Sequence, residues 1–424
     1  MKLKKLKKWT TLLTCATALT VMTACSQSSS QATGTMSSSK TSAVTATTSK
    51  KTNKNNSNYF TSKDSDTSYN ESSATKIKLS GSSADVSGDG AALSGSTVTI
   101  SKAGTYVISG KSDGVQIKVD AGDSDDVHIV LDGVTMTNTN AAINATKTGH
   151  VYLTLKDGTT NTLSDSSSNS DEDADAVIFS KGDLTINGSG TLNIDAKKNN
   201  GIKANDSLHM TGGTYKITSV GDAFNVNDEL NITGTTMTIE SEEDAVKVDN
   251  DDDTSVGTMY LSDNTMTIKA GDDGIHASGD LIIDSGTYKV GKSTEGIQGK
   301  SVTINGGNID VYATDDGVNA ANANASQSEI FFKMTGGTLN VEVGEGDTDP
   351  IDSNGDIIVS GGTINLTGQS GFDFDGSATY TGGDITINGE KQTKIENSMP
   401  GGGGPQGDGG PQGGGQPGGF GGGH

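Results

Sequence analysis

The sequence contains no arginine and very few aromatic residues. All thirty basic residues are lysine, aromatic residues make up 4% of the chain, and the one tryptophan, Trp9, lies near the start. Hydrophobic residues make up 31%, which is little for several ordinary globular cores in a chain of 424 residues. The formal net charge is -23, so we expect no nucleic acid partner. A repeat protein with a thin core fits this composition better than a globule.

Cysteine is almost absent, and both cysteines lie near the N-terminus. A lysine-rich start is followed by a short apolar run over residues 10–22, which is typical of a secretory signal and too short for a span of about 20 apolar residues. The run ends in Met-Thr-Ala-Cys25, a lipoprotein cleavage box with methionine where leucine is usual. We expect residues 1–24 to be removed, Cys25 to be lipidated, and the protein to lie at the extracellular face of the membrane. The alternative is ordinary cleavage near Ala24, which leaves Cys25 as a free thiol. Cys15 falls in the removed segment, so no disulfide is expected.

Two flanking segments are too polar to bury a core. Residues 25–75 are mostly Ser, Thr, Asn and Lys, and residues 391–424 are rich in Gly, Pro and Gln. Such compositions predict a disordered tether and a disordered tail.

The segment between them is organised around a short repeat. Its clearest copy, Ala270–Gly279, reads A-G-D-D-G-I-H-A-S-G and contains an acid, a residue with almost no side chain, an apolar residue and a polar residue. The small residue recurs at Gly201, Ala223, Ala245, Gly274, Gly296 and Gly317, at spacings of 22, 22, 29, 22 and 21. A period near 22 indicates a solenoid.

Each period contains three short alternating strands. In one unit the inward pairs are Leu184/Ile186, Leu192/Ile194 and Ile202/Ala204, separated by turns rich in Gly and Asn. Residues 76–390 are therefore predicted to form an all-β, right-handed, single-stranded parallel β-helix. A β-propeller is the main alternative, but its blades need about 40–50 residues. Extra segments at residues 165–175, 250–257 and 321–328 are expected to be loops, and Tyr215 and Tyr288 are expected in the core.

Stacking the coils places acidic side chains above one another. Neighbouring strands lie about 4.8 Å apart, and like charges at that distance repel unless a proton, solvent or a cation intervenes. Calcium prefers six to eight oxygen ligands, so we expect calcium on two acidic columns. Their members are Asp222, Glu243, Asp244, Asp272, Asp273, Glu295, Asp315 and Asp316. The alternative is that each aspartate only caps a turn by accepting from nearby backbone amides.

A row of outward polar residues follows the acids on the third strand of each coil. Its members are Lys203, Asn225, Lys247, His276, Gln298, Asn319 and Asp352. Amide, lysine and acid side chains beside calcium suit a hydroxylated polymer, and we predict this row as the ligand-binding face. A solvated polar face is the alternative.

The repeats resemble a family of secreted bacterial carbohydrate-binding proteins, first described in a cellulolytic clostridium, whose fold is a pectate-lyase-like right-handed β-helix. The resemblance rests on D-D-G-[IV] at Asp272–Ile275 and Asp315–Val318, and on G-D-L-x-I-[ND] at Gly182–Asn187 and Gly279–Asp284. It covers about residue 76 to the end. It implies calcium on the acidic turns and affinity for cellulose-like or polygalacturonate-like polymers.

We therefore predict a monomeric, lipid-anchored surface protein that binds polysaccharide through a calcium-supported face, with no catalytic residues. The alternatives are a polysaccharide lyase or hydrolase on the same scaffold, or a surface adhesin. The missing arginine argues against calcium-dependent pectate lyases, which generally use that residue as the base. Lys203 or Lys247 would have to replace it.

Overall fold

The computed structural model describes residues 56–250, 253, 255–346 and 348–398, all of which fall in one compact unit, Thr52–His424. The predicted signal segment, Cys25 and most of the glycine-rich tail lie outside the described residues. Within those residues the structure is β-strand and turn, with two short 3-10 helices, η1 (Asn56–Asn58) and η2 (Gln327–Glu329), and no α-helix. No described helix is long and apolar enough to cross a membrane.

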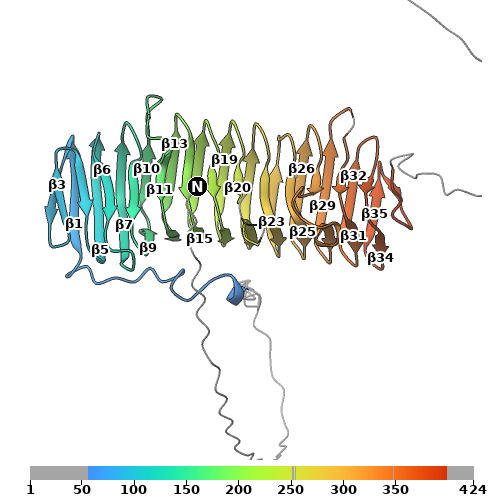
Figure 1. Ribbon diagram of the computed structural model, residues 1–424, viewed down its shortest axis with the longest axis horizontal. Helices are drawn as coiled ribbons and strands as arrows, with labels where there is room; N and C mark the ends of the chain where they lie inside the picture. Colours follow the sequence, from blue (N-terminus) through green and yellow to red (C-terminus); the bar gives the residue numbers. More distant parts are fainter. Residues whose placement is uncertain (1–55, 251–252, 254, 347, 399–424) are drawn as a thin grey trace, which may run out of the picture. The chain divides into compact units, whose positions relative to one another are not determined.

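Strands of successive coils pair in parallel to form three ladders, which confirms the β-helix (Figure 1). We call them sheets 1, 2 and 3 after the first, second and third strand of each coil. Sheet 1 contains β9 (His150–Leu155), β12 (Asp183–Gly188), β15 (Ser207–Thr211), β18 (Glu229–Thr233), β21 (Thr258–Ser262), β28 (Phe331–Met334), β31 (Asp356–Val359) and β34 (Ala378–Tyr380).

Sheet 2 contains β10 (Thr160–Ser164), β13 (Thr191–Ala196), β16 (Thr214–Ser219), β19 (Thr236–Ser241), β22 (Asn264–Lys269), β24 (Gly286–Val290), β26 (Asn308–Ala313), β29 (Thr338–Val343), β32 (Thr363–Thr367) and β35 (Asp384–Ile387). Sheet 3 contains β4 (Thr97–Ile100), β6 (Gln116–Asp120), β8 (Ile143–Lys147), β11 (Ala176–Ser180), β14 (Asn200–Ala204), β17 (Phe224–Val226), β20 (Val246–Val248), β27 (Val318–Ala320), β30 (Ile351–Ser353) and β33 (Phe372–Phe374). The longer strands β23 (Ile275–Ile283) and β25 (Ile297–Ile304) run from sheet 3 into sheet 1.

The first coils and the last one are closed by antiparallel pairs that the repeat pattern does not predict. At the N-terminal end β1 (Thr75–Gly81) pairs with β2 (Ser83–Ser87), and β3 (Ala91–Ser94) pairs with β4. The parallel stack begins with β1, which pairs in parallel with the long strand β5 (Gly104–Asp113), and β5 pairs in turn with β7 (Asp126–Thr137). At the other end β35 pairs with β36 (Glu390–Lys391). Hairpins at both ends cover strand edges that would otherwise offer unpaired backbone groups.

The core is a stack of inward side chains from all three sheets. In sheet 1, for example, Leu184, Leu208, Leu230 and Met259 follow one another in register, and each is buried. Tyr215 and Tyr288 are also buried, as predicted, and their hydroxyls donate to Gly212 and Ser285 carbonyls. The predicted insertions at residues 165–175 and 321–328 lie outside the strands. The residues that the alternation placed inward, such as Leu192 and Ile194, are buried.

The prediction of a disordered tether is wrong for its last part, residues 56–74. This segment, which we call the strap, lies along the outward side of sheet 1. Tyr59 stacks on Tyr260 with ring centroids 3.7 Å apart, and Asp64 is only 2% exposed. The carboxylate of Asp64 accepts from the Thr185 hydroxyl at 2.8 Å. The tail also begins later than predicted, because Ser398 donates its N–H to the Phe372 carbonyl at 2.8 Å.

Candidate functional site

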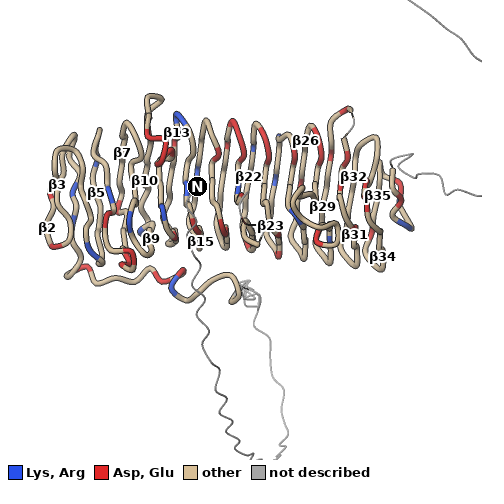
Figure 2. The backbone as a smooth tube through the Cα atoms, viewed as in Figure 1, with Lys and Arg blue, Asp and Glu red and all other residues tan. Residues whose placement is uncertain are grey.

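The predicted column of acids is aligned in the structure. Phe224, Val246, Ile275, Ile297 and Val318 occupy matching positions in successive strands of sheet 3, and one acid lies two residues before each of them. The column of Asp222, Asp244, Asp273, Glu295 and Asp316 therefore runs along the β-helix axis, and it continues to Asp349 before Ile351. Figure 2 shows acidic positions recurring in successive coils.

One oxygen of most column acids has a structural task. The Oδ1 of Asp222 accepts from the backbone N–H of Asp244 at 3.0 Å, and the Oδ1 of Asp244 accepts from that of Asp273 at 2.8 Å. The Oδ1 of Asp273 accepts from the backbone N–H of Glu295 at 3.3 Å in the same way. These buried amide groups would otherwise lack a partner at a turn. The turn-capping alternative is thus correct for one oxygen of these carboxylates.

The small residue after each acid is required by close packing between coils. Ala223 and Ala245 are fully buried. A Cβ on Gly274 would lie 2.6 Å from the Gly296 carbonyl oxygen, and one on Gly296 would lie 2.2 Å from a Val311 methyl. The motif therefore combines an acid that caps the turn with a residue that lets the next coil approach.

In Asp222, Asp244 and Asp273, the second carboxylate oxygen contacts the outward-row residue three positions later in the chain. Asn225 donates to Asp222 Oδ2 at 2.6 Å, and Lys247 Nζ lies 2.9 Å from Asp244 Oδ2. His276 Nδ1 lies 2.9 Å from Asp273 Oδ2.

These contacts leave little carboxylate surface for a cation in this half of the column. One oxygen each of Asp244 and Asp273 and one nitrogen of His276 do lie within 4.8 Å of one another, a spacing that a metal could bridge. However, the ammonium of Lys247 already neutralises Asp244 there. This half of the column is closer to a structural network than to a calcium site.

The other predicted site residues are spread around this network. Lys203 pairs with Asp175 in the acidic insertion at 2.8 Å. Gln298 is half-buried and lies in register between His276 and Asn319. The second acidic column, Glu243, Asp272 and Asp315, is exposed to solvent.

Toward the C-terminal end the column has no such counter-charges. Asp316 and Asp349 are joined there by Asp352 and Asp373, which are neighbours across strands β30 and β33. Within the described ranges, no lysine or histidine forms an ion pair with Glu295, Asp316, Asp352 or Asp373. We call Glu295, Asp316, Asn319, Asp352 and Asp373 the C-terminal acidic cluster. Asp352 was predicted only as a member of the outward row, and Asp373 was not predicted at all, because neither lies in a D-D-G motif.

Burial makes the charged state of this cluster costly. It raises the pKa of Asp352 to about 7, with the charges of Asp316 and Asp373 acting in the same direction. Burial likewise raises the pKa of Glu295 to about 7, with Asp273 adding to it, and that of Asp316 to about 6, with Asp315 adding to it. A cation between these groups would remove both the repulsion and the protons.

Asn319 supplies a second observation at the same place. The residue is 8% exposed, and its side-chain amide nitrogen donates to both carboxylate oxygens of Glu295, at 3.1 and 3.2 Å. Its Oδ1 is buried and has no hydrogen-bond partner among the described residues. The neighbour of Asn319 on the following strand is Asp352. An unpaired buried carbonyl oxygen beside carboxylates is the donor set that calcium prefers.

Comparisons with known proteins identify the family of this chain. A family model described as carbohydrate-binding domain-containing protein matches residues 94–347 and 274–399. A carbohydrate-binding domain-containing protein of Acetivibrio thermocellus is 37% identical over 135 residues, which is 30% of this chain and 47% of the relative. The match thus spans about half the length of that relative. A solved structure of a polysaccharide lyase-like protein from C. thermocellum, a gadolinium derivative, aligns with 75% of this chain and 95% of its own, at 23% identity and a TM-score of 0.43.

Proposed function

Since this chain belongs to the family of carbohydrate-binding domain-containing proteins, we propose that it is a calcium-supported polysaccharide-binding protein of the cell surface. The observation that carries the calcium part is the C-terminal acidic cluster with the unpaired Oδ1 of Asn319. Asp316, Asp352 and Asp373, with Asn319, would hold the ion, and the ion would fix coils whose carboxylates repel one another. Lipidation at Cys25 would attach the monomeric protein to the outer face of the membrane.

The protein binds its polymer without cleaving it. A lysine base needs a lowered pKa, and burial alone would lower that of Lys247. The hydrogen bond and charge of Asp244 outweigh burial and raise the pKa instead. Lys203 is engaged with Asp175 at 2.8 Å. Lys247 therefore keeps its proton, Lys203 is held in an ion pair, and the chain has no arginine to replace them.

A glycan array tests the function, run on the full chain with calcium and again with a chelator. Binding to one class of polysaccharide that falls in the chelator, with no product released, is the expected result. Release of unsaturated sugar from pectate, lost in Lys247→Ala, would show a lyase instead. Attachment to cells that survives polysaccharide digestion would show an adhesin.

A further inference from the structure

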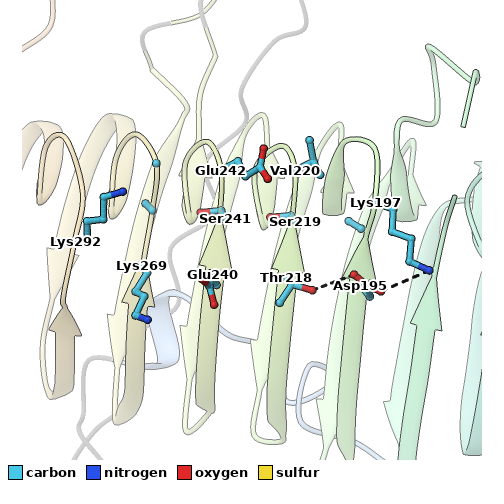
Figure 3. Close-up of a pocket in the computed structure, with 13 residues that line it drawn as sticks. Asp195, Lys197, Thr218, Ser219, Val220, Glu240, Ser241, Glu242, Lys269 and Lys292 are labelled. Carbon is cyan, nitrogen blue, oxygen red and sulfur yellow. Dashed lines mark hydrogen bonds and ion pairs between the residues drawn. The ribbon is translucent and has the colours of Figure 1, made fainter. Parts of the chain in front are cut away.

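Three surface clefts lie along sheet 2, and the largest also includes the turns that follow the strands of that sheet. The largest, of about 670 Å³, is lined by residues from five successive coils, from Asp195 to Lys292 (Figure 3). A second, of about 410 Å³, shares Asp195 and Thr218 with it. A third, of about 470 Å³, begins at Lys289 and ends at Thr367. Together they follow the β-helix axis from Thr162 in β10 to Thr367 in β32, and we call them the axial groove.

The third cleft of the groove carries a regular row of polar side chains. Asn340 donates to Asp310 at 2.6 Å, and Asn365 donates to Asn340 at 2.8 Å. An asparagine amide has two N–H groups and two lone pairs, so these two side chains keep groups free for a ligand while the ladder fixes their orientation. The repeat along the row is the strand spacing, about 4.8 Å. This arrangement presents hydrogen-bonding groups at equal steps to a long, straight ligand.

The groove also collects the exposed large hydrophobic side chains. Over the described part of the chain these are Val220 and Tyr312, each 38% exposed. Val220 lines the largest cleft and Tyr312 the third. Apolar side chains exposed beside fixed polar groups are typical of a ligand site. The ring of Tyr312 gives the flat apolar face of a sugar a surface to stack on.

The groove differs from the rest of the protein in its net charge. Its lining includes five lysines and five acidic residues, so its formal net charge is zero in a chain of net charge -23. The lysines are Lys197, Lys216, Lys269, Lys289 and Lys292. A neutral lining gives no electrostatic advantage to an anionic polymer, which the surrounding negative charge would repel.

We infer that the axial groove of sheet 2 is the polysaccharide site, and that its ligand is a linear, uncharged polysaccharide lying along the β-helix axis. Tyr312 stacks on a sugar ring, Val220 contacts another, and Asn340 and Asn365 hydrogen-bond to hydroxyl groups. This inference rests on the proposed function and moves the site from the predicted row on sheet 3 to sheet 2.

The test is the affinity of the full chain for a soluble mixed-linkage β-glucan, measured by calorimetry with calcium present. Tyr312→Ala should weaken binding about tenfold, whereas Tyr312→Phe, which keeps the ring, should bind as the wild type does. Asn365→Ala should weaken binding about threefold. Gln298→Ala, on the outward row of sheet 3, is the matched control and should change nothing. Unchanged thermal midpoints ensure that each variant is folded.

The outcomes distinguish the two proposals. If Tyr312→Ala binds the β-glucan as tightly as the wild type does, the groove is not the binding site, although the proposed polysaccharide binding stands. Weaker binding by Gln298→Ala would place the site on sheet 3 instead. Preference for polygalacturonate over the β-glucan would overturn the uncharged ligand. A wild type that binds neither polymer, with or without calcium, overturns the proposed function and the groove together.

Discussion

The Oδ1 atom of Asp222 accepts a hydrogen bond from the backbone N–H of Asp244, one coil further along, at 3.0 Å. The same contact recurs one coil earlier, where the Oδ1 of Asn200 accepts from the N–H of Asp222 at 3.0 Å. An amide oxygen thus performs the task as well as a carboxylate oxygen. The hydrogen bond explains why a short polar side chain occupies this position, but it does not explain the negative charge of that side chain.

This equivalence predicts that charge and capping can be separated at position 222. Asp222→Ala leaves the buried N–H of Asp244 without an acceptor, which should lower the free energy of unfolding by about 1–3 kcal/mol. Asp222→Asn keeps the acceptor and removes a carboxylate whose pKa burial raises to about 6, so it should cost less than the alanine variant. Chemical denaturation measures both. Equal losses in the two variants would mean that the negative charge itself holds the coils.

Calcium should stabilise the protein through the C-terminal acidic cluster. An ion present at a hundred times its Kd adds about 2.7 kcal/mol to the free energy of unfolding. Asp352→Asn removes a carboxylate from the cluster and should abolish most of that gain. Asp85→Asn, an exposed change of the same charge on β2, should keep it. Thermal unfolding with calcium and with a chelator measures the difference, and a gain that Asp352→Asn retains would place the ion elsewhere.

Without calcium the stability should fall as the pH rises from about 5 to 8. The folded-state pKa values of Glu295 and Asp352 are raised to about 7, so the folded protein binds more protons than the unfolded chain in this range. Such groups contribute their full stabilisation below the pKa that they have in the unfolded state. That stabilisation is lost as the pH rises through their pKa in the folded state. Urea midpoints across this range should fall with pH in the chelator and change less in calcium. The slope should be smaller in Asp352→Asn, and an unchanged slope there would contradict the assignment.

The repeat was predictable from sequence because its two causes are local. Inward residues alternate within each strand, and the acid and the small residue recur at every turn, so Ile275 and Asp273 could be placed without coordinates. The caps, the strap and the groove could not be placed in this way. The groove residues Asn340 and Asn365 occupy ordinary outward positions, and only the strand register makes them one row. For the strap, the one available signal was its aromatic residues, Tyr59, Phe60 and Tyr69, in an otherwise polar segment.

The partners of the second carboxylate oxygens could not be predicted from the sequence either. The steps of an acid and a small residue look alike in sequence, but Asp244 pairs with Lys247, whereas the negative charges of Asp315, Asp349 and Asp373 act on Asp316. The partner of the second carboxylate oxygen depends on the residue three positions later in the chain and on the side chains of the next coil. The column could therefore be predicted, and its division into a neutralised half and a repelling half could not.

The strap should be an integral part of the folded domain. Burial alone would raise the pKa of Asp64, but hydrogen bonds from His209, Thr61 and Thr185 hold that pKa well below its usual range. Asp64 and Glu229 in turn outweigh burial and raise the pKa of His209 to about 9, so the imidazole is charged at neutral pH. Asp64 thus anchors a buried charge pair between the strap and sheet 1.

Asp64→Ala should therefore lower the free energy of unfolding by about 2–4 kcal/mol, because it leaves the charged His209 and the Thr185 hydroxyl without their buried partner. Asp66→Ala is the matched control, since the exposed Asp66 carboxylate accepts hydrogen bonds from Ser68, which belongs to the strap itself. Amide hydrogen exchange should show residues 59–69 losing protection in Asp64→Ala and keeping it in Asp66→Ala. Protection lost equally in both would mean that the strap is held by its aromatic contacts, such as Tyr59 on Tyr260, and not by the charge pair.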